Sequence, residues 1–161
     1  MTDPDWERRV AEVWAAQDQL DESALRARIE SLTAELPEDS SEGLFERACA
    51  LDSTGHSDRA VPLYRRALAD GLAGTRRRRA TIQLASSLRN IGRATESVDL
   101  LEAELEAEPD ELDDAVRAFL ALALVDVGRE REATSLALSA LAPHLPRYQR
   151  SLTNYARHLT S

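Results

Sequence analysis

Small and hydrophobic residues recur along the chain at helical spacing, and one arrangement of them occurs three times. Its first copy consists of Ala48, Gly55, Ala60, Tyr64, Ala67 and Leu68. The same offsets give Ala85, Gly92, Ser97, Leu101, Glu104 and Leu105 in the second copy. They give Ala121, Gly128, Ala133, Ala137, Ala140 and Leu141 in the third copy. The glycines of successive copies are 37 and 36 residues apart (92−55 and 128−92), which is typical of helical repeat arrays.

Each copy predicts two helices joined by a tight turn at its glycine. Glycine readily adopts the left-handed conformation that ends a helix, because it has no Cβ atom. Consecutive helices should therefore fold back on one another as hairpins. The expected pairs are 41–54 with 57–70, 75–91 with 94–108, and 110–127 with 130–142, which define repeats over 41–70, 75–108 and 110–142.

Both ends of the chain predict further helices. Residues 5–36 form a degenerate first helix pair, whose second helix spans 22–36 and ends at Pro37. A last helix over 147–159 carries an apolar stripe of Tyr148, Leu152, Tyr155 and Leu159. This helix is expected to cap the final repeat. No strand pattern is found in the sequence, so we predict one all-α domain over 1–161 with about nine helices.

Composition favours a globular protein outside the membrane. The chain has 161 residues, of which 43% are hydrophobic and 30% charged, enough to form a core. The longest apolar run, Ala118 to Val125, has eight residues, whereas a membrane-spanning helix needs about 18 or more. The amino-terminal sequence lacks the pattern of a secretory signal. The single cysteine, Cys49, fits a reducing compartment. We expect a cytoplasmic protein.

The charge and the aromatic content argue against nucleic acid as a partner. The net charge is −9, and every basic side chain apart from histidine is arginine, because the chain has no lysine. A nucleic-acid interface requires clustered cations. Aromatic residues make up only 4% of the chain, which leaves few side chains on which bases could stack.

The reactive side chains form no catalytic or metal-binding pattern. His56, His144 and His158 are far apart in sequence, and no His-Glu-x-x-His motif is present. Cys49 has no neighbour in sequence that would activate it, so a buried or groove-lining thiol is favoured over a nucleophile. The sequence also has no glycine-rich phosphate loop. We expect no enzymatic activity, no metal and no cofactor.

The three copies resemble the tetratricopeptide repeat, which has a small residue and a turn glycine followed by alanine, an aromatic residue and alanine. The first copy follows this pattern with Ala48, Gly55, Ala60, Tyr64 and Ala67. In the second copy Ser97 and Glu104 replace the alanines, and in the third Ala137 stands where a bulky residue is usual, leaving space that a neighbouring helix must fill. Within this superfamily the chain is most similar to a small bacterial branch, the group 5 type. The resemblance implies a right-handed α-solenoid of antiparallel helix pairs, with a concave wall built from the first helix of each pair.

The concave wall is where a partner would be expected to bind. One stripe of each first helix must pack on its partner helix, which leaves a neighbouring stripe on the wall. This predicted groove consists of Phe45, Cys49, Asp52, Arg79, Ile82, Ser86, Arg89, Asn90, Ala118, Leu122, Val125 and Asp126. Its mixture of apolar and charged residues suits a peptide segment of a partner. The alternative is that its apolar members are covered by the first two helices or by a second copy of the chain.

Four consecutive arginines, Arg76–Arg79, form the sharpest charge feature. They stand at the start of a predicted helix, where the helix dipole disfavours positive charge. Arg79 together with Arg89 could hold an acidic peptide segment through paired hydrogen bonds. The alternative is that surrounding acidic helices neutralise the cluster or that it lies in a solvated loop.

Taken together, the sequence predicts a non-enzymatic protein-interaction module that binds a segment of another protein on its concave face. A self-association module, in which the groove is filled by its own chain or by a twin subunit, is the second hypothesis. A small enzyme built on Cys49 or the histidines is the third and least favoured. The sequence leaves the identity of the partner and the oligomeric state open.

Overall fold

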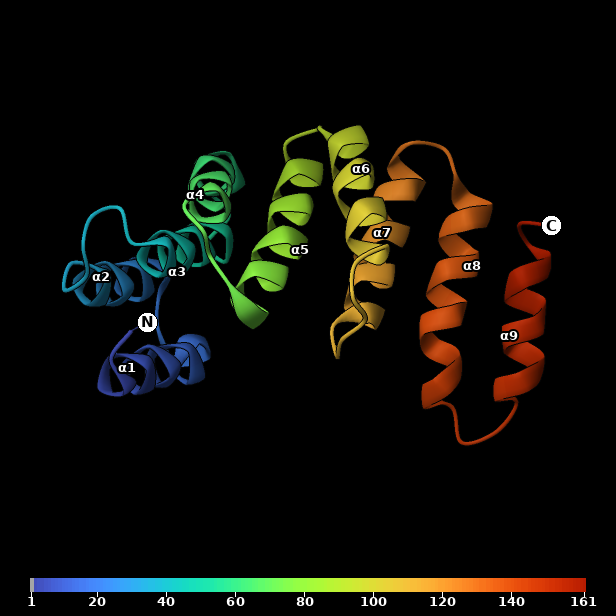
Figure 1. Ribbon diagram of the computed structural model, residues 1–161, viewed down its shortest axis with the longest axis horizontal. Coiled ribbons are helices and arrows are strands. Elements are labelled where there is room, and N and C mark those ends of the chain that lie inside the picture. The colour runs from blue at the N-terminus through green and yellow to red at the C-terminus, as the bar shows by residue number, and fades with distance from the viewer. Residues whose placement is uncertain (1) are drawn as a thin grey trace. The chain divides into compact units, whose positions relative to one another are not determined.

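The computed structural model describes residues 2–161, and within them the chain is α-helical without strands (Figure 1). Its helices are α1 (Pro4–Ala15), α2 (Glu22–Thr33), α3 (Ser41–Asp52), α4 (Ser57–Ala69), α5 (Gly74–Asn90), α6 (Ala94–Leu105), α7 (Asp113–Asp126), α8 (Glu130–Leu141) and α9 (Gln149–His158). Two short 3-10 helices, η1 (Gln17–Gln19) and η2 (Ala142–His144), follow α1 and α8. Nine α-helices within these residues confirm the predicted all-α architecture with a helix after the last repeat.

The three predicted turns share one backbone geometry. Gly55, Gly92 and Gly128 have φ values of 76°, 81° and 78°. After each glycine, the next residue donates its N–H to the carbonyl five positions earlier, at 2.9 Å from His56 to Leu51, 2.8 Å from Arg93 to Leu88 and 2.8 Å from Arg129 to Leu124. This hydrogen bond satisfies a carbonyl at the helix end that would otherwise lack a partner. The repeat read from the sequence is therefore a structural repeat.

Three predicted boundaries shift by three residues. α6 ends at Leu105, not at residue 108. α2 ends at Thr33, not Leu36, because the chain tightens into i to i−3 bonds such as that from Leu36 N–H to the Thr33 carbonyl (3.1 Å). α7 begins at Asp113, not Asp110. There the Asp110 carboxylate accepts the Leu112 N–H at 2.7 Å, a local turn that competes with helix formation.

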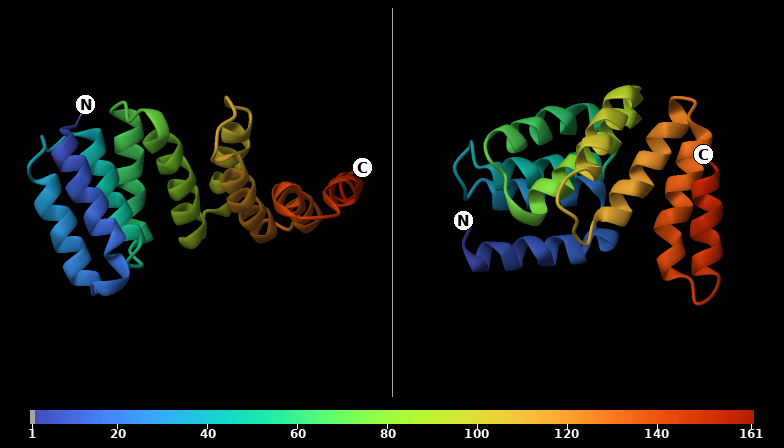
Figure 2. Two further views of the ribbon diagram at one scale, coloured as in Figure 1. Left: turned by 90° about the horizontal axis from the view of Figure 1, so that it is seen from below. Right: turned by 45° about the vertical axis from the view of Figure 1, so that its right-hand side comes forward.

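The chain divides into two compact units, Met1–Gln83 and Leu84–Ser161. In the first unit, α1 to α4 lie side by side (Figure 2). Trp6, Val10 and Leu32 form one part of its core, and Leu25, Ile29 and Ala50 form another. The repeat residues Ala48, Ala60, Tyr64 and Ala67 are all fully buried. The pattern of small and aromatic residues is thus a packing pattern between α3 and α4.

In the second unit, α7 packs on both α6 and α8, and α9 packs on α8 (Figure 2). α9 is fixed to α8 by the Ser135 hydroxyl, which donates to the Ala156 carbonyl at 2.8 Å. The apolar stripe predicted for this helix is partly wrong, because Tyr148 and Tyr155 are 76% and 68% exposed. The helix instead buries the small side chain of Ala156. Ala137 also remains exposed, so α9 does not fill the space left at that position.

Candidate partner-binding surface

The residues of the predicted groove fall into both units. Phe45, Cys49 and Asp52 lie on α3, and Arg79 and Ile82 lie on the part of α5 that belongs to the first unit. The remaining members belong to the second unit: Ser86, Arg89 and Asn90 on α5, and Ala118, Leu122, Val125 and Asp126 on α7.

In the first unit the apolar members of the predicted groove are buried. Phe45 has no exposed surface, and its ring lies 6.2 Å from that of Tyr64 at a tilt of 55°. The guanidinium of Arg79 lies over the Phe45 ring, 5.3 Å from the ring centre, and forms a cation–π contact with it. Cys49 and Ile82 are only 3% and 5% exposed. Phe45, Cys49 and Ile82 therefore belong to the core and offer no surface to a partner.

A small polar pocket of about 260 Å³ remains beside these buried residues. Its lining consists of Trp14, Gln17, Cys49, Ser53, Arg79 and Gln83. The Cys49 thiol donates to the Gln83 side-chain carbonyl at 3.3 Å. Burial raises the pKa of Cys49 to about 12, so the thiolate is scarce at neutral pH.

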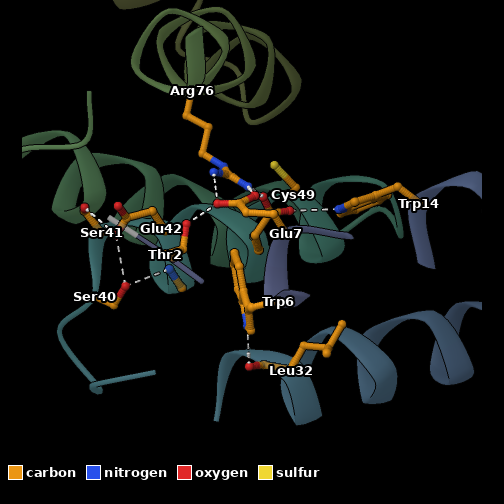
Figure 3. A network of polar contacts seen from close by, with 12 residues as sticks. Thr2, Trp6, Glu7, Trp14, Leu32, Ser40, Ser41, Glu42, Cys49 and Arg76 are labelled. Carbon is orange, nitrogen blue, oxygen red and sulfur yellow. Dashed lines mark hydrogen bonds and ion pairs between the residues drawn. The ribbon is translucent and has the colours of Figure 1, made fainter. Parts of the chain in front are cut away.

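Arg76 holds α1, α3 and α5 together within the first unit. Its two terminal nitrogens donate to the Glu7 carboxylate at 2.8 and 2.6 Å (Figure 3). Its Nε donates to Glu46 at 3.2 Å, and Glu46 also accepts the Trp14 indole N–H at 2.8 Å. The guanidinium lies 5.8 Å from the ring centre of Trp6. Of the two interpretations of the arginine cluster, neutralisation by acidic helices is the one that the structure bears out for Arg76.

The charges of this network perturb one another in the expected direction. Hydrogen bonds from Arg76 hold the pKa of Glu7 below its usual value, and the same carboxylate raises the pKa of Arg76. Glu46 is only 2% exposed, so its charge is taken out of water and depends on these partners. The network is a structural element of the first unit.

In the second unit the residues of the predicted groove that lie on α7 are exposed to solvent. Leu122 and Val125 are 47% and 50% exposed, and Ala118, one turn earlier on the same face of α7, is exposed as well. Arg89 of α5 and Asp126 of α7 form an ion pair, with 2.6 Å between Nε and the carboxylate oxygen. We call these five residues the α7 surface. It joins an apolar stripe to a half-exposed ion pair.

Sequence reasoning missed most of the polar pocket in the first unit. Gln83 follows Arg79 by four positions on α5 and so shares its face, a signal that could have found it. Gln17 and Ser53 carry no such signal, because one lies in η1 and the other just after α3. Trp14 is half-buried and donates its indole N–H to Glu46.

The described residues contain no group of histidine, cysteine, aspartate and glutamate side chains that could bind a metal ion. His144 instead bonds to Asp114, with 2.9 Å between Nε2 and the carboxylate oxygen. None of the helices within residues 2–161 is both long and apolar enough to span a membrane.

The chain is similar to a known protein family and to solved structures. Residues 41–159 match the family model described as Tetratrico peptide repeat. A crystal structure of a candidate kinesin light chain from Podosopora anserina, with nearly identical TPR-like repeats, has a TM-score of 0.71 at 20% identity and covers 99% of this chain and 85% of that one. The Q17M form of that protein has a TM-score of 0.65 at 16% identity, with coverages of 95% and 93%. No protein of curated function matches the chain.

These likenesses confirm the predicted fold class, an α-solenoid of antiparallel helix pairs. The family match begins at residue 41, where the first clear repeat was predicted. It leaves out α1 and α2, which the sequence identified as a degenerate pair. At 20% identity and below, the two solved structures bear on the fold alone.

Proposed function

Because the chain belongs to the tetratricopeptide repeat family, we propose that it is a non-enzymatic interaction module that binds a segment of another protein on the α7 surface. The supporting observation is the exposed apolar stripe of Ala118, Leu122 and Val125 beside the Arg89–Asp126 pair. Apolar residues at positions i, i+4 and i+7 suit an apolar segment lying along the helix.

The proposed binding region contains those residues of the predicted groove that belong to the second unit and retain solvent exposure. Ser86 is half-buried and Asn90 is exposed, and both lie on α5 near Arg89 in the sequence. Charged residues at the edge of such a surface set orientation and association rate more than affinity. Phe45, Cys49 and Ile82 are left out because they are buried.

Self-association through the same stripe is the second candidate. The exposed apolar residues that would accept a partner would also accept a second copy. Two copies that each carry a net charge of −9 repel one another, which favours a different protein as the partner. Light scattering at micromolar concentration distinguishes the two, since a monomer excludes the homodimer.

The test places a photo-crosslinking amino acid at Leu122 of the full chain in cells that produce it naturally. We expect a crosslink to one apolar segment of another protein. Replacing Leu122 and Val125 by Asp should abolish capture of that protein without unfolding the chain.

The matched control is Leu141→Asp. Leu141 lies on α8 of the same unit and is 48% exposed, nearly the same as Leu122. Equal loss of capture in this control, or no protein whose capture depends on Leu122, would refute the proposal. A cytoplasmic location and a bacterial origin stay predictions that rest on the sequence alone.

A further inference from the structure

A second pocket, larger than the polar one, lies between α2, α3 and α4 of the first unit and contains no residue of the predicted groove. Its volume is about 430 Å³, which lies within the range of sites for small molecules. Its apolar floor comes from three helices. Ile29 of α2 and Ala50 of α3 are almost fully buried, and Leu63 of α4 is half-buried.

Three arginines surround this floor, Arg26 of α2, Arg47 of α3 and Arg59 of α4. Arg47 donates to the main-chain carbonyls of Gly43 and Glu38, at 3.4 and 3.1 Å, so its charge is not met by a carboxylate there. Arg59 is exposed and makes no ion pair within residues 2–161.

Arg26 is the most informative of the three. Its Nη1 is shielded from solvent and has no hydrogen-bond partner among the described residues. The Glu22 carboxylate is 3.9 Å away, beyond hydrogen-bond distance. This ion pair with Glu22 is longer than a hydrogen bond, so the Arg26 guanidinium keeps donor capacity for an acceptor that enters the pocket.

The pocket thus contains three guanidinium groups against one lining carboxylate, Glu30, in a chain whose net charge is −9. We propose that it binds a small organic anion, a free monocarboxylate joined to a short apolar body. The carboxylate would lie between Arg26 and Arg59, since guanidinium groups match the planar geometry of carboxylates. The apolar body would cover Ile29, Ala50 and Leu63. This site is independent of the α7 surface.

The test titrates the full chain with octanoate and follows NMR signals of Ala27, Ala50 and Leu63. We expect saturable binding at millimolar concentration or below. Octanol, which lacks the charge, and acetate, which lacks the apolar body, should each bind at least about tenfold more weakly, because each loses one of the two interactions. Octanol binding as tightly as octanoate would overturn the proposal.

Substitutions of residues that line the pocket test whether octanoate binds there. Arg26→Gln and Arg59→Gln should each weaken octanoate binding about tenfold, the effect of losing a hydrogen bond to a charged group. Arg28→Gln is the matched control, because Arg28 is exposed on the same helix and does not line this pocket. Ala27→Trp, at an exposed lining position, should fill the pocket and abolish binding while the helical circular dichroism signal is retained.

Two results would overturn the assignment. One is octanoate affinity that is unchanged in the two arginine variants and in Ala27→Trp. The other is tighter binding of a capped Leu-Glu dipeptide than of octanoate, which would make the pocket a second docking point for a protein segment. Neither result affects the proposal for the α7 surface.

Discussion

Equivalent positions of the repeat have opposite environments in the two units. Phe45 on α3 and Ala118 on α7 both lie three residues before the small residue that starts each copy, and Cys49 and Leu122 both lie one residue after it. Phe45 and Cys49 are buried, whereas Ala118 and Leu122 are exposed. The same helical register therefore builds core in the first unit and surface in the second.

The difference comes from what packs on each stripe. In the first unit, Tyr64 and the Arg79 guanidinium cover Phe45, and Trp14 of α1 lines the pocket beside Cys49. Arg76 fixes α1 in place through Glu7 and Glu46. Periodicity determines which residues share a face, but the neighbours of that face determine whether water reaches it.

The strongest way to break this comparison is to truncate one large side chain of this stripe in each unit. Phe45→Ala should lower the free energy of unfolding by about 3–5 kcal/mol, because it leaves a cavity in a packed core. Leu122→Ala should lower it by less than about 0.5 kcal/mol, since half of the side chain is already in water. Urea denaturation measures both. Similar losses in the two variants would contradict the assignment of core and surface.

Removing Arg76 tests whether the ionic network holds the first unit together. Arg76→Leu should cost about 3 kcal/mol of stability, because among the described residues the buried Glu46 carboxylate then keeps only the Trp14 indole as a hydrogen-bond partner. The matched control is Arg8→Leu, whose ion pairs with Asp5 and Glu12 are exposed to solvent and should contribute little to stability. Both variants are compared by thermal unfolding. A neutral effect of Arg76→Leu would show that α1 does not depend on the network.

Thiol reactivity compares the accessibility of the two stripes directly. Cys49 should react with iodoacetamide at least about a hundredfold more slowly than a free thiol, because burial raises its pKa to about 12. A Leu122→Cys variant in a Cys49→Ser background should react at the rate of an ordinary free cysteine. Mass spectrometry over time follows both reactions. Rapid modification of Cys49 in the folded protein would mean that its stripe opens to solvent.

The smallest expected effect concerns acid stability. A hydrogen bond from His144, followed by one from Arg117, holds the pKa of Asp114 below its usual value. A lowered pKa stabilises the fold above the unfolded value of about 3.9, and this contribution is lost as the pH falls through the folded value. Asp114→Asn should remove less than about 1 kcal/mol near neutral pH, because the Asp114 side chain is 38% exposed.

Glu7 in the first unit has a pKa shifted in the same direction, through Arg76. Glu7→Gln should therefore also flatten the dependence of stability on pH below about 4. Denaturation of both variants at acidic and neutral pH tests this expectation. A variant that is as acid-sensitive as the unmodified chain would show that its carboxylate does not contribute.

Local interactions explain why most of the fold could be predicted. The turn at Gly92 needs a residue that tolerates positive φ and a hydrogen bond from the Arg93 N–H to the Leu88 carbonyl. Both depend on residues close together in the chain, so the sequence specifies the turn locally. The packing residues Ala60 and Tyr64 likewise follow from helical spacing. Leu122 was assigned to an exposed wall by the same reasoning, and its side chain is half in water.

The sequence by itself determined the helices, their hairpin turns and the faces that pair, because these depend on residues a few positions apart. Only the tertiary structure decided that Phe45 is core while Leu122 is surface, that Arg76 is neutralised by Glu7 and Glu46, and that Arg26 and Arg59 line one pocket. Glu7 and Arg76 are 69 residues apart. Burial and ion pairing at such separations depend on which helices meet in space, and helical spacing carries no information about that.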